Sequence, residues 1–217
     1  MGLFSSFKHF LISIVTVVTL CISTPVLAFQ TIIPVTGTIY NESVKPGAVN
    51  LLSLEDFTEA VKDGDAQAVK GLYAEEIFMM RVIQQPSGKP GFVSPIDGIA
   101  TQFGMAANNN VTGMLAHNFA SGRFFFDLSM DDRVSVVYGD GSIKEYKVTA
   151  IYKFQALSPK SSASDFVNLD TGEKLSAAGL FTRMYTGSHH LTLQTCIQEG
   201  TEDSWGRLFV IAEPLNA

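Results

Sequence analysis

The feature that most constrains this sequence is a succession of short segments, between residues 77 and 212, in which apolar and β-branched side chains alternate with others. A period of two places successive side chains on opposite faces of a strand, whereas a helix needs a period near 3.6. We therefore predict strands at 77–84, 111–116, 133–138, 142–155, 190–197 and 205–212. Many short strands with few helices indicate an all-β protein, and closure into an antiparallel or mixed barrel would leave no exposed strand edge.

Short helices are predicted outside this pattern. Ser53 is a suitable N-cap for a helix with apolar residues on one face, which Asp63-Gly64 would end. A second short helix is predicted near residues 66–72, and Ser176 is placed to cap a third over 177–185. Asp140-Gly141 predicts a tight hairpin between the strands on either side of it. The region from 157 to 188 is otherwise irregular, and long loops of this kind in a compact domain are usually functional or disordered.

The N-terminus has the pattern of an export signal. Residues 10–28 carry no charge, Lys8 precedes them, and Ala28 ends a suitable cleavage site. The segment is also nearly long enough to cross a membrane, so two alternatives stay open, a cleaved signal peptide and a retained anchor. Either one places the rest of the chain outside the cytoplasm, secreted or membrane-anchored. Residues 29–70 are then a linker with short helices, and the barrel occupies 71–217.

Composition excludes one class of partner. The formal net charge is −6 and no run of Lys or Arg occurs, so the basic surface of a nucleic-acid-binding protein is missing. No cofactor motif is present. His189 and His190 are adjacent where a predicted strand begins, and neighbouring residues on a strand point to opposite faces, which argues against a shared metal ion.

Three residues at or near strand ends can carry chemistry. Cys196 is the only cysteine beyond the export signal, and an exported thiol is either buried as an inert side chain or used. Arg207 lies within an otherwise apolar strand, where a guanidinium needs an anion or a carbonyl as partner. His117 ends an apolar strand, a position that also suits an ordinary buried histidine.

The motifs around these residues resemble those of sortases. Thr192-Leu193-Gln194-Thr195-Cys196 matches their TLxTC signature, and residues 205–210 (WGRLFV) are similar to the following strand with its arginine. Ala116-His117 is similar to their histidine motif and precedes the cysteine, as in that family. Residues 125–148 resemble the intervening segment, except that Asp131 stands where that family usually has Gly. The resemblance extends over residues 71–217.

This resemblance implies a sortase-type barrel of about eight strands and a cysteine transpeptidase. Such an enzyme cleaves a C-terminal sorting motif, LPxTG-like, of an exported protein and joins the new carboxyl end to an amine of the cell wall or a pilin. Cys196 would be the nucleophile, His117 the proton donor and acceptor, and Arg207 the donor to the oxyanion or the peptide backbone. The elementary chemistry agrees, because a nearby cation favours the thiolate and Arg offers five N–H donors.

The resemblance also suggests residues that bind the peptide. Thr195, next to the cysteine, would supply a donor near the oxyanion, with ordinary strand propensity as its alternative explanation. The irregular region falls where sortases form the peptide groove. The groove candidates in it are Phe166, Leu180, Phe181 and Tyr185. The alternative is that residues 177–185 are a helix that packs against the barrel.

Two alternatives to a transpeptidase stay open. A sortase-type protein can act only as a hydrolase, with the same site residues, or can bind peptides and cell-surface partners without turnover. A papain-like peptidase is excluded, because its cysteine precedes its histidine, whereas His117 precedes Cys196 here.

Overall fold

The computed structural model describes residues 51–215, and the predicted signal or anchor at 1–28 lies outside them, as does the predicted linker up to residue 50. The strands are β1 (Val69–Ala74), β2 (Phe78–Gln84), β3 (Ile99–Gln102), β4 (Thr112–Leu115), β5 (Arg133–Tyr138), β6 (Ile143–Ala156), β7 (Phe166–Asn168), β8 (Lys174–Leu175), β9 (Leu191–Glu199) and β10 (Glu202–Pro214). The helices are α2 (Leu54–Val61), α3 (Gly104–Ala107), the 3-10 helix η1 (Ser121–Asp127) and α4 (Ala177–Tyr185).

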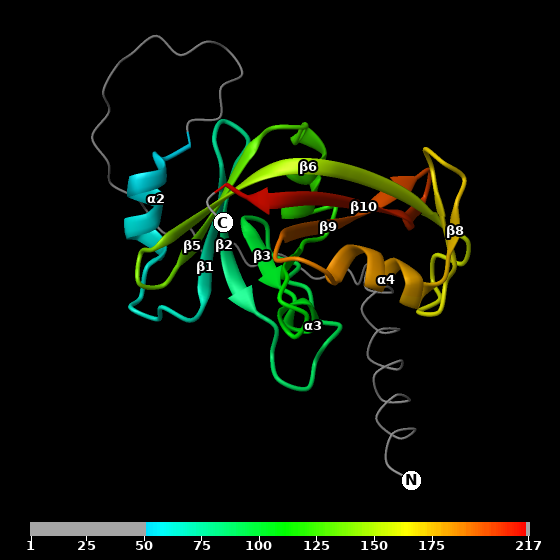
Figure 1. The fold of residues 1–217 in the computed structure, drawn as a ribbon, viewed down its shortest axis with the longest axis horizontal. Helices are drawn as coiled ribbons and strands as arrows, with labels where there is room; N and C mark the ends of the chain where they lie inside the picture. Colours follow the sequence, from blue (N-terminus) through cyan, green and yellow to red (C-terminus); the bar gives the residue numbers. More distant parts are fainter. Residues whose placement is uncertain (1–50, 216–217) are drawn as a thin grey trace.

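Eight of these ten strands close into a barrel (Figure 1). Their order is β10-β9-β4-β3-β2-β1-β5-β6, and β6 pairs again with β10 to complete the ring. The pairs β2–β3 and β4–β9 are parallel, and the others around the ring are antiparallel. β7 and β8 extend the sheet beyond β6. The all-β class and the closed mixed barrel of about eight strands are therefore confirmed.

The hairpin predicted at Asp140-Gly141 joins β5 to β6. Gly141 has a φ of +88°, in the left-handed region that glycine adopts without a steric penalty. Asp140 Oδ1 accepts a hydrogen bond from the Ser142 backbone N–H at 2.9 Å, which closes the turn locally. β6 continues to Ala156, so the predicted extension of this strand is also confirmed.

The helix predicted near residues 66–72 is wrong. The chain forms β1 there, which pairs with β2 on one side and with β5 on the other. Val69 and Leu72 are buried in the barrel interior, and pairing on both edges satisfies the backbone. Pairing with β2 and β5 therefore outweighs the weak helical pattern of this segment. The segment predicted as the first barrel strand, 77–84, is the second, β2.

Two helices begin at the predicted caps. Ser53 Oγ accepts from the Asp56 backbone N–H at 3.1 Å, at the start of α2. Phe57 of α2 packs with Tyr73 and Val137 on the outside of β1 and β5. Ser176 Oγ accepts from the Gly179 backbone N–H at 3.1 Å, at the start of α4. Both helices therefore cover the barrel from outside.

Alternation along the strands divides the core into an interior and an outer layer. On β9 and β10, Leu193 and Leu208 point into the barrel and join its main cluster. Phe209 points outward and packs with Phe154 of β6 and with α4 residues in a second cluster. The outer face of β9 and β10 is thus the face that α4 partly covers, and it is the face on which the candidate site lies.

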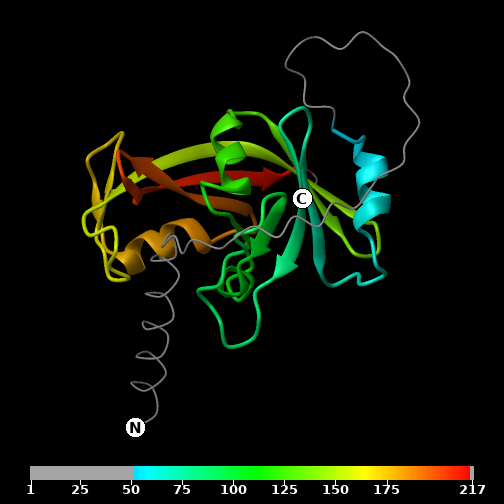
Figure 2. The same ribbon diagram turned by 180° about the vertical axis from the view of Figure 1, so that it is seen from behind.

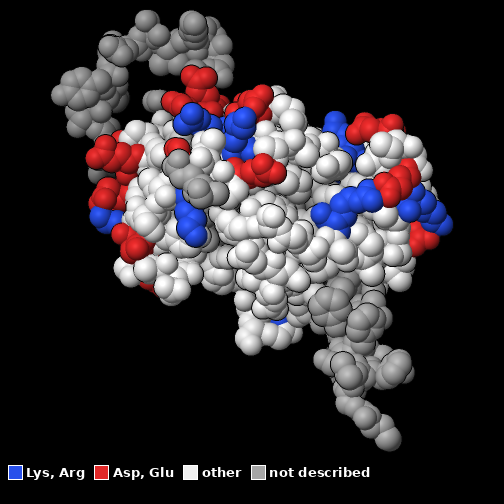
Figure 3. Space-filling view, viewed as in Figure 1, with Lys and Arg blue, Asp and Glu red and all other residues white. Residues whose placement is uncertain are grey.

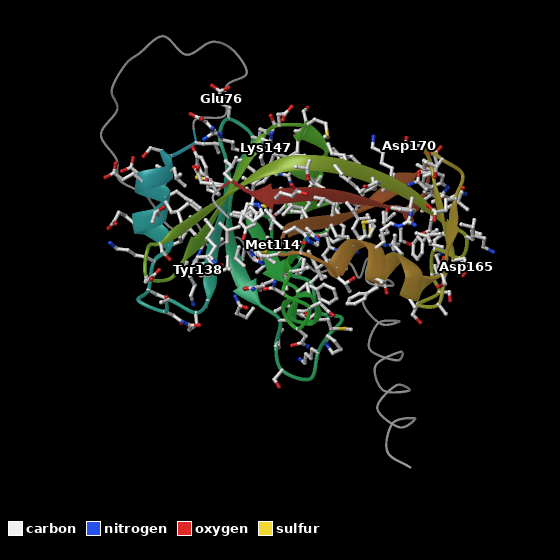
Figure 4. All side chains as sticks on the ribbon, in the orientation of Figure 1. Glu76, Met114, Tyr138, Lys147, Asp165 and Asp170 are labelled. Carbon is white, nitrogen blue, oxygen red and sulfur yellow. The ribbon has the colours of Figure 1, made fainter. Side chains whose placement is uncertain are left out.

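Views from opposite sides place α2 at one end of the molecule and the β7–β8 extension at the other (Figures 1 and 2). Charged side chains gather towards these two ends, whereas much of the surface between them is uncharged in this view (Figure 3). Met114 of β4 lies between the two ends, and Asp165 and Asp170 lie at the β7–β8 end (Figure 4). Within residues 51–215, no helix has the length and apolar character needed to cross a bilayer.

Candidate active site

Cys196 and Arg207 are brought together by the pairing of β9 with β10. The register of this antiparallel pair sets Arg207 directly opposite Cys196. Residues directly opposite in a sheet have their side chains on the same face, with Cβ atoms about 4.5–5.5 Å apart. Leu193 of β9 and Leu208 of β10 point into the barrel. Cys196 and Arg207 each lie an odd number of positions from these leucines, so both side chains point to the outer face. The hairpin alone therefore places the thiol beside the guanidinium.

His117 is carried to the other side of Cys196 by β4. This strand runs parallel to β9, with Leu115 paired to Gln194, and the Ala116 backbone N–H donates to the Gln194 carbonyl at 3.2 Å. His117 and Cys196 each follow this pair by two residues. Leu115 belongs to the outer cluster, so a residue two positions later is directed to the same face. His117, two residues beyond the end of β4, thus follows the strand next to β9, while Cys196 of β9 and Arg207 of β10 are directly paired, and this order defines the row His117, Cys196, Arg207.

Arg207 is only 1% exposed and is held by backbone carbonyls. Its Nη1 donates to the carbonyl oxygens of Ser204 at 2.8 Å and Gly206 at 2.7 Å. The guanidinium lies over the Phe166 ring, 5.9 Å from its centroid. Burial lowers the pKa of Arg207 to about 10, with the Glu202 charge acting in the opposite direction. The side chain remains a cation at neutral pH and is fixed in orientation.

His117 is 7% exposed and lies under an aromatic ring. The Phe119 ring is stacked on the imidazole with centroids 4.7 Å apart and an interplanar angle of 16°. Phe119 itself is 53% exposed, so it covers the histidine from the solvent side. Burial lowers the pKa of His117 below its ordinary 6.5, and a hydrogen bond to the Val93 backbone carbonyl opposes this shift. The neutral imidazole is thereby favoured near neutral pH.

The Cys196 side chain is 3% exposed. A thiolate is the form of cysteine that attacks carbonyl carbon, so any chemistry at this position begins from the reduced side chain. The register of β9 with β10 sets the Arg207 cation directly opposite this residue.

Thr195, predicted to bind near the oxyanion, is 2% exposed and faces away from the thiol. Neighbouring residues on a strand point to opposite faces, so its side chain is directed to the inner side of β9. There its Oγ1 closely approaches Gly122 of η1, and no hydrogen-bond partner of this oxygen is found among residues 51–215. The hydroxyl therefore packs against η1 instead of facing the row of site side chains.

The four groove candidates do not form an accessible surface. Phe166, Leu180, Phe181 and Tyr185 are between 0% and 6% exposed and belong to the outer core cluster. The prediction that they contact a peptide is therefore corrected, because packing of α4 and β7 against the barrel buries them. As in the alternative explanation, α4 is a helix that packs against the outside of the barrel. Phe166 supports Arg207, and Tyr185 donates to Gln194 Oε1 at 2.6 Å, which braces β9 just before Cys196.

Three residues that sequence reasoning missed help to build the site. Gly122 allows η1 to approach the carbonyls of Ala116 and His117, where a Cβ would come within 2.6 and 2.8 Å of these oxygens. Asn118 Nδ2 donates to the Asp203 carbonyl at 3.1 Å and so ties the end of β4 to β10. Ser204 supplies a carbonyl to Arg207. The only signal of these roles in the sequence is their proximity to His117 and Arg207.

The two other adjacent histidines are placed apart from this row. His189 Nε2 lies 2.9 Å from the Tyr146 hydroxyl and its Nδ1 lies 2.8 Å from the Asn110 carbonyl. His190 contacts the carbonyls of Ser188 and Met184 instead. Within residues 51–215, no cluster of three or more His, Cys, Asp or Glu side chains is arranged to hold a metal ion.

Comparison with known proteins gives distant structural likenesses. No family model and no curated protein matches the sequence. Sortase A from Corynebacterium diphtheriae is 13% identical with a TM-score of 0.46, over 69% of this chain and 61% of that one. Sortase A from Listeria monocytogenes is 13% identical with a TM-score of 0.42, over 68% of this chain and 87% of that one. Sortase E1 from Streptomyces coelicolor, solved with a tripeptide in its active site, is 17% identical with a TM-score of 0.43, over 71% and 91%.

These solved structures are sortases of different classes, and the motif resemblance in the sequence is to the same family. The chain spans 61% of the length of the Corynebacterium protein. At such identities and scores, the chemistry has to be argued from the site of this chain itself.

Proposed function

We propose that this protein is a sortase-like cysteine transpeptidase with Cys196 as nucleophile, His117 as proton donor and acceptor, and Arg207 as oxyanion or backbone donor. The observation that carries the proposal is the row of these three side chains on one face of β4, β9 and β10, with the cysteine in the middle. A nucleophile flanked by a histidine and a fixed cation is the arrangement that acyl transfer needs.

In the first half of the reaction, the Cys196 thiolate attacks the scissile carbonyl carbon of a peptide and forms a C–S bond. The carbonyl oxygen becomes an oxyanion, which the buried guanidinium of Arg207 stabilises. The C–N bond then breaks, and His117, which carries the proton it took from the Cys196 thiol, gives this proton to the departing amine. A thioester, the amine product and a neutral His117 remain. The lowered pKa of His117 makes it a ready proton donor in this step.

In the second half, an incoming amine attacks the thioester carbon, and neutral His117 accepts the proton that the amine loses. The C–S bond breaks and Cys196 leaves as a thiolate, which restores the starting state. If water replaces the amine, the same steps give a free carboxylate and the enzyme is a hydrolase. The stacked Phe119 ring and the burial of His117 restrict access of bulk water to this proton.

The proposed substrate is an exported protein with a C-terminal LPxTG-like sorting motif, and the proposed acceptor is an amine of the cell wall or a pilin. The resemblance of the motifs around His117, Cys196 and Arg207 to those of sortases supports this choice of substrate. Function outside the cytoplasm, secreted or membrane-anchored through residues 10–28, forms part of this proposal and follows from the export-signal pattern.

The test is intact-mass analysis of the reduced full chain with a library of LPxTG-like and LAxTG-like peptides and an amine. We expect a peptide adduct that disappears in Cys196→Ala and converts to an amide product when the amine is added. His117→Asn should slow this conversion, while the matched variant His190→Asn, outside the row, should not. Hydrolysed peptide without amide would support the hydrolase instead. An unmodified Cys196 with every peptide, although an iodoacetamide probe labels it, would contradict the transpeptidase and favour a binding module.

A further inference from the structure

The turn that follows His117 is fixed to the histidine through the backbone. The N–H groups of Ala120 and Gly122 both donate to the His117 carbonyl, at 3.0 and 2.9 Å. Any displacement of this turn therefore moves the histidine backbone and the Phe119 ring that covers its imidazole. The contacts that hold this turn therefore also determine the position of His117.

An ion pair from a different part of the chain holds the turn. Arg123 donates from Nη1 to Asp97 Oδ1 and from Nη2 to Asp97 Oδ2, both at 2.8 Å. Its Nη1 also donates to the Ala120 carbonyl at 2.8 Å, and its guanidinium lies 4.2 Å from the Phe124 ring centroid. A planar fork that binds a carboxylate at two points fixes orientation as well as distance. Arg123 therefore locks the turn to Asp97.

Asp97 is itself anchored to the barrel. Its Oδ1 accepts from the Gly98 backbone N–H at 3.1 Å, and the Gly98 carbonyl accepts from the Arg81 backbone N–H of β2 at 2.9 Å. The connection from β2 to β3 that contains Asp97 also contains Val93, whose carbonyl receives the hydrogen bond from the His117 ring. Both the backbone and the ring of His117 thus depend on this connection.

We infer that Asp97 and Arg123 are a positioning pair for His117, holding the imidazole at the distance and angle that proton transfer beside Cys196 requires. The inference deepens the proposed function and rests on it for its catalytic meaning. The pair is largely exposed, with side chains 57% and 45% accessible, and exposed ion pairs contribute little to stability. Its main effect is therefore on geometry, where a small displacement of a catalytic group lowers the rate strongly.

The test compares Arg123→Lys with Arg183→Lys. Lysine keeps the charge at both positions but loses the fork that binds a carboxylate. Arg183 forms a similar two-point pair with Glu173, also partly exposed, on α4 and the β7–β8 connection, away from the His117 turn. For Arg123→Lys we expect kcat for the amide-forming reaction to fall about tenfold or more, with little change in KM and in the melting temperature. Arg183→Lys should leave kcat unchanged.

A second readout is independent of turnover. The imidazole signals of full-length protein labelled with ¹³C-histidine, assigned with His117→Asn, should show a shifted or doubled His117 signal in Arg123→Lys and an unchanged one in Arg183→Lys. Asp97→Asn should have the same effect as Arg123→Lys, and the double variant should lose no more than either single one, because both break one interaction.

The outcomes separate the two proposals. If the wild-type protein is active and Arg123→Lys changes neither kcat nor the His117 signal, the positioning pair is overturned. The transpeptidase proposal then still stands. Wild-type protein that forms no adduct with any peptide would overturn the transpeptidase. In that case the His117 signal still decides the pair: a shift in Arg123→Lys alone supports it, and no shift overturns it.

Discussion

The two halves of the candidate site are built in different ways. Cys196 and Arg207 lie opposite each other on one hairpin, and the ladder of β9 with β10 sets their positions. His117 arrives from β4, beyond the last residue pair of a short parallel ladder. It is held by a turn, by the Phe119 ring and by the Val93 carbonyl and Asp97 side chain of the β2–β3 connection. One half is fixed by a ladder of backbone pairs, and the other by a turn together with contacts from side chains and a loop carbonyl.

This difference determines how each half should respond to change. A ladder of backbone hydrogen bonds tolerates most substitutions at a pair, so the hairpin half is sensitive mainly to the chemistry of the side chains it presents. The histidine half depends on close packing and on single ion pairs, so substitutions that never touch the reacting atoms can displace it. The experiments that follow test this contrast, beginning with the largest effect.

Replacing Arg207 with Lys should lower the rate of acyl-enzyme formation by about a hundredfold or more. Arginine reaches two carbonyls, of Ser204 and Gly206, while still presenting a planar cation, and an ammonium group has no equivalent fork. The measurement is the rate of adduct formation on Cys196 by intact mass.

The matched control is Arg81→Lys, an exposed position on β2 that should react at the wild-type rate. A fully active Arg207→Lys variant would show that only the charge matters, and the assignment of Arg207 as a donor of fixed geometry would be wrong.

Replacing Gly122 with Ala should destabilise the histidine half by about 1–3 kcal/mol through overpacking. A Cβ at this position would lie 2.3 Å from Thr195 Oγ1 and within 3 Å of two carbonyl oxygens, so η1 must shift away from β9. The free energy of unfolding in urea measures this loss, and the rate of adduct formation should fall with it.

Gly104→Ala is the comparison variant, because its Cβ would meet only Gln85 Oε1, at an ordinary 3.6 Å. It should be neutral or slightly stabilising. Equal stability of the two alanine variants would mean that η1 can move without cost, and the close packing would not be what holds the turn.

The pH dependence of stability should also separate the halves. Burial lowers the pKa of folded His117 below 6.5, the ordinary value expected in the unfolded chain, so the unfolded state binds a proton more readily. The associated stability is present above the unfolded pKa and is lost as pH falls through the folded pKa. In unfolding experiments between about pH 7.5 and pH 5, wild-type protein should therefore lose stability relative to His117→Asn.

His190→Asn is the control and should follow the wild-type curve. If His117→Asn and wild-type protein changed in parallel over this range, then the imidazole would be solvated in the folded state and the enclosure by Phe119 would be ineffective.

The same contrast explains what the sequence allowed us to predict. The hairpin at Asp140-Gly141, the cap at Ser176 and the strands of Cys196 and Arg207 follow from local patterns, and the structure has all of them. Once these two predicted strands pair as a hairpin, their register sets the thiol and the guanidinium opposite each other. Local residue types carry this information because the interactions themselves are local or are repeated along a ladder.

What could not be predicted depends on contacts between distant segments. The pairing of β1 with β2 and β5 overrides its helical pattern, and Asp97 reaches Arg123 across 26 positions of the sequence. The groove prediction for Phe181 was wrong for a related reason, since an apolar residue on a helix looks the same in the sequence whether it binds a ligand or packs against a barrel. Only the arrangement of α4 on the outer face decides between these.

The smallest expected effect concerns Asp131, at the end of the connection from η1 to β5. Its φ of +71° lies in the left-handed region, where residues other than glycine are strained, and it stands where the resembling segment usually has Gly. Asp131→Gly relieves this strain but loses an exposed ion pair with Lys147 and gains chain entropy in the unfolded state. We expect a net stabilisation of about 0.5 kcal/mol in urea unfolding, with unchanged activity, and Lys147→Gln reports the loss of the ion pair alone. A destabilised Asp131→Gly variant would show that the hydrogen bond from the Asp131 N–H to Val148 needs the ordered side chain, and that even this end of the histidine half is held by side-chain contacts.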